Sequence, residues 1–153
     1  AAPAGLAAAA GPGLAEAPAE DRTALLIRRA GKGAFEACRG LLEARADPNG
    51  GDAMSFSALH GAAKSGSLPL VQMLVACGAE VNSCVEGWQR ETALHYACKY
   101  GHAEVARFLL VSGADAGLET KEGKRPADLA AAKGHAAVLR ELDAALARAA
   151  GRE

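Results

Sequence analysis

Apolar side chains recur along the chain in short groups with helical spacing. One group is Leu70, Val71, Leu74 and Val75, and another is Val105, Phe108, Leu109 and Val111. Positions three and four residues apart lie on one face of a helix, so each group predicts an amphipathic helix. A shorter segment rich in small residues precedes each group, and it begins after Ser57 or Thr92, which are favoured helix N-caps. The pattern therefore predicts pairs of helices.

Four glycines mark a repeat within this pattern. They are Gly33, Gly66, Gly101 and Gly134, separated by 33, 35 and 33 residues. Each falls where a short first helix gives way to a second, and glycine adopts the positive φ of a helix C-cap without strain. A period of about 33 residues is typical of a stacked solenoid, in which each unit buries its apolar face against its neighbours.

The two central units agree position by position. The segment Ser57-Ala-Leu-His-Gly-Ala-Ala aligns with Thr92-Ala-Leu-His-Tyr-Ala-Cys, and Gly78-Ala-Glu-Val-Asn aligns with Gly113-Ala-Asp-Ala-Gly. These segments resemble the ankyrin repeat, whose unit reads roughly D-x-x-G-x-T-P-L-H-x-A-A-x-x-G-H-x-x-V-x-x-L-L-x-x-G-A-D-x-N. The resemblance implies an all-α solenoid of helix-turn-helix units with short β-hairpin fingers.

The resemblance also gives the expected organisation of the chain. We expect an Ala/Gly/Pro-rich tail over residues 1–21 and an ankyrin repeat domain over residues 22–150, with repeats at about 23–49, 52–82, 83–117 and 118–150. The outer repeats are atypical, with Ile27 and Asp128 in place of the repeat's His and Arg45 in place of a glycine. Terminal repeats are expected to depart from the pattern because one side faces water. The tail has no core of its own, so we expect a neighbouring chain to hold it.

One link between repeats is longer than the others. From Asn82 to Thr92 is 10 residues, whereas the corresponding link from Asn49 to Ser57 is 8. The two extra residues account for the spacing of 35, and they lie in a finger that contains Trp88. This irregularity makes Trp88 our first candidate for a partner contact, although covering its own enlarged turn is the alternative role.

Charge and cysteine content narrow the functional classes. The formal net charge is -1, from 17 basic and 18 acidic side chains, which gives no general attraction to nucleic acid or to an anionic membrane. No apolar run is long enough to predict a membrane span. The four cysteines have no C-x-x-C spacing, so we expect free thiols in a reducing intracellular compartment, either the cytoplasm or a chloroplast or mitochondrion. Cys38, Cys77 and Cys98 are expected on apolar helix faces, and Cys84 in the long finger.

The sequence contains no recognisable catalytic constellation. His60, His95, His102 and His135 all occupy repeat positions, where the resemblance implies hydrogen bonds to the backbone, and no metal-binding H-E-x-x-H pair is present. Gly31-Lys32-Gly33 lacks the remaining residues of a phosphate loop. We therefore expect no enzyme activity, no cofactor and no metal.

In ankyrin repeat proteins, finger tips and the ends of the first helices line a concave face that binds partners. Carried over to this sequence, the candidate partner-binding residues are Met54, Phe56, Lys64, Trp88, Gln89, Glu91, Lys99, Tyr100, Lys121, Lys124 and Lys133. All six lysines of the chain fall on this expected face, Lys32 included, which favours a partner with an acidic surface. The alternative is that these lysines only interact with the carbonyl groups at helix ends.

These observations favour a non-catalytic adaptor that binds a protein partner through its concave face, as a structural subunit of a larger assembly. The alternative is an inhibitor of the ankyrin type that covers a functional surface of an enzyme or a transcription factor. Nucleic-acid binding is not expected, because dispersed lysines at this net charge do not form a concentrated basic stripe.

Overall fold

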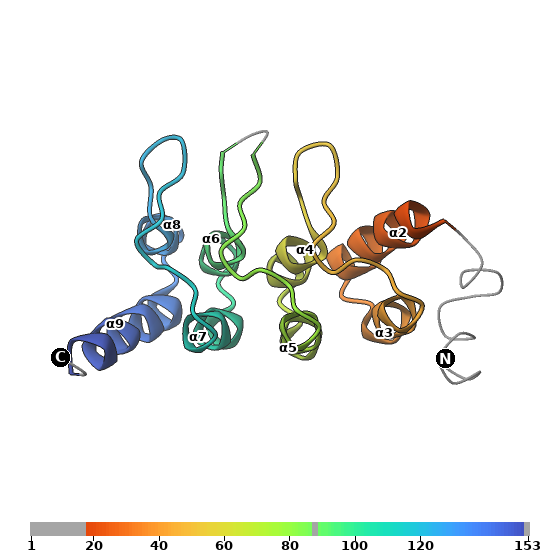
Figure 1. The fold of residues 1–153 in the computed structure, drawn as a ribbon. Helices are drawn as coiled ribbons and strands as arrows, with labels where there is room; N and C mark the ends of the chain where they lie inside the picture. The colour runs from red at the N-terminus through yellow and green to blue at the C-terminus, as the bar shows by residue number, and fades with distance from the viewer. Residues whose placement is uncertain (1–17, 87–88, 152–153) are drawn as a thin grey trace.

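The computed structural model describes residues 18–86 and 89–151. Within them, eight α-helices follow one another: α2 (Ala19–Gly31), α3 (Phe35–Glu43), α4 (Ala58–Ser65), α5 (Leu68–Ala76), α6 (Ala93–Lys99), α7 (Ala103–Val111), α8 (Pro126–Lys133) and α9 (Ala136–Ala150). The helices form two layers, with α2, α4, α6 and α8 in one and α3, α5, α7 and α9 in the other (Figure 1). We call them the inner and the outer helices.

Three fingers project above the inner helices, over residues 47–57, 80–92 and 115–125 (Figure 1). Their pairing is limited to isolated antiparallel bridges between Gly51 and Ser57 and between Cys84 and Thr92. Since the described part of the chain otherwise contains only helices and turns, the predicted all-α solenoid of helix-turn-helix units is confirmed.

The first helix begins earlier than expected. Pro18 is the N-cap of α2, so the last three residues that we assigned to the tail, residues 19–21, are helical. The fixed φ of proline suits a helix start, and Glu20 and Asp21 place negative charge in the first turn, where the helix dipole favours it. These local preferences extend α2 by nearly a turn.

The repeat glycines adopt the predicted conformation at the helix ends. Gly33, Gly66, Gly101 and Gly134 have φ of 67°, 78°, 78° and 73°. Gly78 and Gly113 end the outer helices α5 and α7 with φ of 96° and 102°. At the matching position of the first repeat, Arg45 has a φ of 72°, which is unfavourable for a residue with a Cβ.

The core runs between the inner and outer layers. Its largest fully buried apolar residues are Leu26, Leu41, Leu59, Leu70, Leu74, Leu94, Leu109, Val71, Val105 and Val138. Small residues on the inner helices permit close packing. A Cβ built at Gly61 would lie only 2.9 Å from the backbone nitrogen of Gly31, so α4 and α2 approach backbone to backbone at this point.

Two asparagines connect successive repeats. The Nδ2 of Asn49 donates to the carbonyl of Gly78 at 2.9 Å, and its Oδ1 accepts from the backbone N–H of Glu80 at 2.7 Å. Asn82 makes the same pair of bonds to Gly113 and Asp115, at 3.0 and 2.7 Å. Gly117 occupies the third such position, and the outer helix that follows it, α9, runs for 15 residues instead of 9.

Candidate protein-binding surface

His60 and His95 have the structural role that the sequence predicts. The backbone N–H of Ser57 donates to Nδ1 of His60 at 3.0 Å, so the ring proton lies on Nε2, which donates to the carbonyl of Ser83 at 2.9 Å. His95 is held in the same way by Thr92 and by the carbonyl of Lys124. Burial lowers the pKa of both rings below the usual 6.5. Both ring nitrogens of each histidine are therefore hydrogen-bonded, and the two histidines hold the bases of the fingers in place.

His102 and His135 connect the ends of the inner helices. The Nε2 of His102 lies 3.0 Å from the carbonyl oxygen of Lys64, and the Nε2 of His135 lies 3.1 Å from that of Lys99. Each contact joins one repeat to the preceding one. These contacts help to hold the ends of α4, α6 and α8 beside one another. As a result, the lysines at these three ends also lie on the same side of the molecule.

The ring of Tyr100 lies near two of the lysines at the helix ends. The ammonium of Lys64 is 5.7 Å from the centre of the ring, and that of Lys99 is 5.8 Å away. Each exposed cation–π contact contributes roughly 0.5–1 kcal/mol. Tyr100 remains 42% exposed, so its ring is available to a partner. We call Lys32, Lys64, Lys99, Tyr100 and Lys133 the helix-end row.

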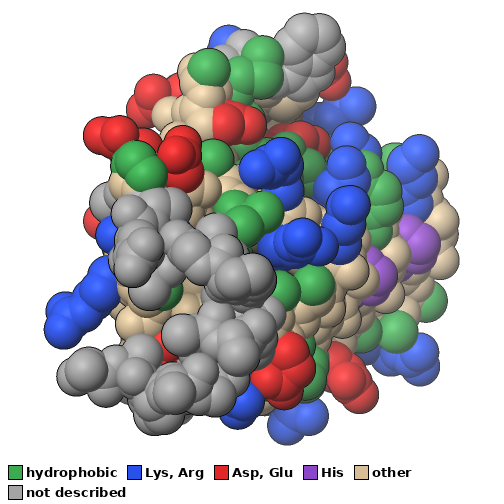
Figure 2. Space-filling view, turned by 90° about the vertical axis from the view of Figure 1, so that its right-hand side faces the viewer, with side chains coloured by type: hydrophobic (Ala, Val, Ile, Leu, Met, Phe, Trp, Pro, Cys, Tyr) green, Lys and Arg blue, Asp and Glu red, His purple; other side chains and the backbone are tan. Residues whose placement is uncertain are grey.

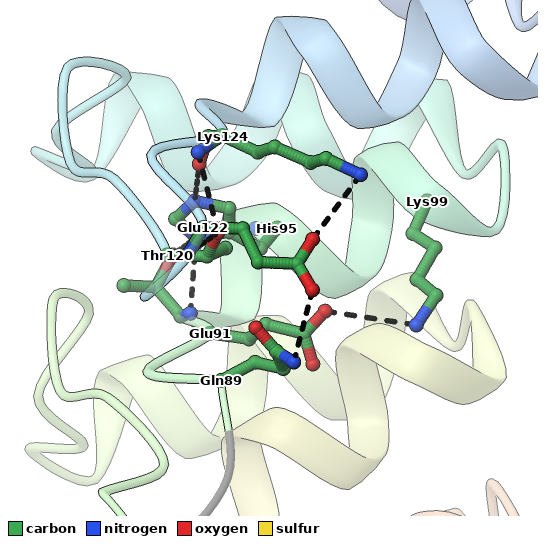
Figure 3. A network of polar contacts seen from close by, with 8 residues as sticks. Gln89, Glu91, His95, Lys99, Thr120, Glu122 and Lys124 are labelled. Atoms are coloured by element: carbon green, nitrogen blue, oxygen red, sulfur yellow. Dashed lines mark hydrogen bonds and ion pairs between the residues drawn. The ribbon is translucent and has the colours of Figure 1, made fainter.

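Glu91 lies at the base of the second finger and does not form part of the exposed surface. It is only 7% exposed, and its carboxylate lies 3.6 Å from the ammonium of Lys99. Figure 3 shows Lys99 extending from its helix toward this carboxylate. Burial, together with the charge and hydrogen bond of Glu91, raises the pKa of Tyr96. Glu91 therefore positions Lys99 and Tyr96, and we remove it from the direct contacts expected from the sequence.

Phe56 and Met54 come from the first finger and have different environments. The half-buried ring of Phe56 packs against His60 and Tyr96, with centroid distances of 5.6 and 5.8 Å. Met54 is 44% exposed near the finger tip, where its backbone N–H donates to Oδ1 of Asp52 at 2.8 Å. Sequence reasoning missed Tyr96, although it stands where the preceding repeat has Gly61 and so adds a ring to this cluster.

The second and third fingers are linked to each other. The backbone N–H of Lys121 donates to the carbonyl of Gln89 at 2.9 Å, and the amide of Gln89 lies 3.4 Å from a carboxylate oxygen of Glu122. Glu122 also pairs with Lys124 at 3.3 Å (Figure 3). The positive charge of Lys124 is thus offset within its own finger. Trp88, the first candidate from the sequence, lies outside the described residues.

One of the four thiols, that of Cys77, has a different environment from the one expected. Cys38 and Cys98 are buried, and burial raises the pKa of Cys38 to about 11 and that of Cys98 to about 12. The expectation for Cys77 was wrong, because this residue is the C-cap of α5 and its side chain is exposed. Cys84 is partly exposed in the second finger. No group of three His, Cys, Asp or Glu side chains within residues 18–86 and 89–151 is arranged to hold a metal ion.

No helix among the described residues is both long enough and apolar enough to cross a membrane.

Comparison with known proteins identifies the repeats. A family model described as ankyrin repeats, three copies, matches residues 59–145, which is more than half of the chain. The chain belongs to the ankyrin repeat family. Ankyrin repeats are protein-interaction units, so the chain is a protein-interaction module, as the sequence predicted.

Curated relatives share the repeats but differ as whole proteins. Protein phosphatase 1 regulatory subunit 27 of Homo sapiens is 41% identical over 75 residues, which are 48% of this chain and 47% of that protein. Ankyrin repeat domain-containing protein 40 of Mus musculus is 45% identical over 73 residues, 46% of this chain and 19% of that protein. The NF-kappa-B p105 subunit of Mus musculus is 41% identical over 106 residues, 68% of this chain and 10% of that protein. The matched region therefore covers about half of the phosphatase regulatory subunit and a smaller share of the other two relatives.

Proposed function

We propose that this chain is a non-catalytic adaptor that binds a protein partner on the surface formed by its fingers and its helix-end row. The described candidates on this surface are Met54 on the first finger, Gln89 and Lys121 where the second and third fingers meet, and Lys64, Lys99, Tyr100 and Lys133 at the helix ends. Phe56 packs against Tyr96 at the base of the first finger, and Lys124 belongs to the third finger, where it pairs with Glu122. Together with its partner, this protein would form part of a larger assembly, as a structural subunit.

The exposed ring of Tyr100 is the observation that carries this proposal. Two ammonium groups, those of Lys64 and Lys99, lie within about 6 Å of its centre, and these contacts favour the observed position of the ring. Exposed aromatic residues are common among the residues that dominate interface energies, and a favoured ring position reduces the conformational entropy lost on binding. Charged residues around them act mainly on the rate of association.

The test begins with affinity purification from the native source, followed by calorimetry of the purified partner with variants of this chain. Tyr100→Ala should weaken binding by about thirtyfold, the effect of losing about 2 kcal/mol at an interface anchor. Val111→Ser is the matched control, because Val111 is 72% exposed on the outer helix α7. Unchanged binding by Tyr100→Ala together with a loss by Val111→Ser would place the interface on the outer helices and contradict the proposal.

Regulation of an enzyme by surface occlusion is the second candidate. The observation that favours it is the similarity to a phosphatase regulatory subunit, which covers about half of each chain. An assay of the catalytic subunit of protein phosphatase 1 with and without this chain tests it. Inhibition that Tyr100→Ala relieves would support the regulatory role, whereas unchanged phosphatase activity at saturating concentration would exclude this enzyme as the target.

A further inference from the structure

The basic side chains of the surface fall into two groups by their ion pairs. Lys99 pairs with Glu91 and Lys124 with Glu122, so their charges are offset within the chain. Lys121 and Lys133 have no ion pair among the residues that the structure describes, and they lie singly on the third finger and at the end of α8. Four further basic side chains without an ion pair among these residues lie together at the ends of α2 and α4. They are Arg28, Arg29, Lys32 and Lys64.

Close packing brings these two helix ends together. A Cβ at Gly61 of α4 would lie 2.9 Å from the backbone of Gly31 at the end of α2. A Cβ at Gly33 would lie 3.6 Å from the hydroxyl oxygen of Ser65, the residue after Lys64. Lys32 stands between Gly31 and Gly33, so it lies beside the end of α4. Figure 2 looks onto this end of the solenoid and shows Lys and Arg side chains gathered near the fingers.

The helix dipoles do not account for this concentration of charge. The C-terminus of a helix carries about half of a negative elementary charge. The end of α2 alone has the cations Arg28, Arg29 and Lys32 close together, and Lys64 lies at the end of α4. Arg28 shares a cavity with the carboxylates of Glu20, Asp47 and Asp52, so its charge is partly offset. The other three cations against about one negative charge from two helix ends leave an excess of about two positive charges. The role of these side chains in capping helix ends is therefore insufficient to explain their number.

The shape of the site suits an extended chain. Arg28, Arg29 and Lys32 line a shallow cavity of about 120 Å³ together with Leu25. From there the surface continues past Lys64 to the exposed ring of Tyr100. The side chains thus provide a basic site beside the partly buried Leu25 at one end and an exposed aromatic ring beside Lys64 at the other.

We propose that an acidic polypeptide segment of the partner binds across the ends of α2 and α4, with its carboxylates on Arg28, Arg29, Lys32 and Lys64 and its chain directed toward Tyr100. This inference rests on the proposed function and names the partner chemistry for one half of the surface. A polypeptide is favoured over single-stranded nucleic acid, which binds on series of stacked aromatic side chains. Tyr100 is the only aromatic side chain in the described residues that is more than about a third exposed.

The test uses a fluorescent polyglutamate peptide as the probe, with fluorescence anisotropy as the readout. A glutamine peptide of the same length and a single-stranded oligonucleotide of the same charge are the comparison ligands. We expect the glutamate peptide to bind more tightly than both, with an affinity that decreases as salt rises. The double variant Lys32→Glu/Lys64→Glu should lose about tenfold in affinity for the glutamate peptide. The substitutions replace two positive charges that attract the peptide by two negative charges that repel it.

The matched control is Arg107→Glu/Arg140→Glu, which changes the net charge equally at two exposed positions on the outer helices α7 and α9. An equal loss by both double variants would show an effect of net charge alone and overturn the proposal, as would preferential binding of the oligonucleotide or no binding of the glutamate peptide. With the purified partner, full binding by Lys32→Glu/Lys64→Glu but weak binding by Tyr100→Ala would reject this inference and leave the proposed function intact. Circular dichroism melts confirm that each variant is folded.

Discussion

The ring of His102 lies directly over the α-carbon of Gly66. A Cβ built at Gly66 would meet the ring at 2.5 Å, and the ring is held there by its contact with the carbonyl of Lys64. Gly101 and His135 repeat the arrangement one unit later, at 2.8 Å. Gly66 and Gly101 thus have a second role, because each also leaves room for the histidine that joins the next repeat to it.

This relationship predicts different costs for the same substitution at two equivalent glycines. Gly66 and Gly134 have similar φ, 78° and 73°, but nothing lies within 4 Å of a Cβ at Gly134. Both alanine variants pay the backbone cost of about 1–2 kcal/mol. Gly66→Ala should lose about 1 kcal/mol more, since the ring must move and its hydrogen bond weakens. Urea denaturation of the two variants measures the difference, and equal destabilisation would show that the histidine contact contributes nothing.

Acid should destabilise the fold through His60 and His95. Their pKa values are lowered in the folded state, so at moderately acidic pH the unfolded chain binds more protons than the folded one. Stability is therefore complete above the unfolded value of about 6.5 and falls as the pH decreases below it, toward the folded pKa. Protonation would also place a hydrogen on Nδ1, where the backbone N–H of Ser57 or Thr92 now donates.

Denaturant titrations at about pH 7.5 and about pH 5.5, on either side of the usual histidine pKa, measure this dependence. The variant His95→Gln should show a smaller difference between the two conditions than the wild type, because one of the two groups has been removed. A difference as large as that of the wild type would assign the pH dependence to other groups.

A stabilising substitution is expected at Arg45. This exposed residue has a φ of 72° at the position that Gly78 and Gly113 occupy in the next repeats. Arg45→Gly should raise the free energy of unfolding by about 1 kcal/mol, because glycine tolerates the left-handed conformation. Arg45→Ala removes the same side chain but keeps the Cβ, so it should give no such gain. A comparable gain from both variants would attribute the effect to the arginine side chain.

The four thiols should react in a definite order. Cys77 is exposed and Cys84 partly exposed, whereas Cys38 and Cys98 are buried with raised pKa values. Alkylation of the native protein at neutral pH, followed by peptide mass spectrometry, should modify Cys77 first and Cys84 next. Cys38 and Cys98 should react only as fast as the chain unfolds. Early labelling of Cys98 in the folded protein would be inconsistent with its burial.

Much of the fold follows from local sequence signals. The positions of Gly33, Gly66, Gly101 and Gly134 predicted the helix ends because glycine, having no Cβ, tolerates the positive φ that a helix end requires. The histidine roles followed from the repeat register. The tail was assigned as far as residue 21 because Pro18 was read as part of it, whereas α2 begins at Ala19 and proline is also favoured at helix starts.

The surface was harder to predict because exposure depends on contacts between elements. Glu91 was expected at the interface, but its burial depends on where Lys99 and Tyr96 lie relative to the finger base. Cys77 was expected to be buried from the apolar pattern around it, yet the helix ends at that residue and turns its side chain outward. The separation of the lysines into paired and unpaired groups likewise required the positions of their carboxylate partners.

The hydrogen bonds of Asn49 and Asn82 strengthen two junctions between repeats against a force that stretches the molecule. Asn49 and Asn82 each hold the end of the following repeat by two hydrogen bonds, whereas Gly117 offers no side chain to the last repeat. In a solenoid each repeat contacts only its neighbours, so an extending force is resisted junction by junction. When the two termini are pulled apart, we therefore expect the pair of α8 and α9 to detach first while the units joined by Asn49 and Asn82 remain stacked.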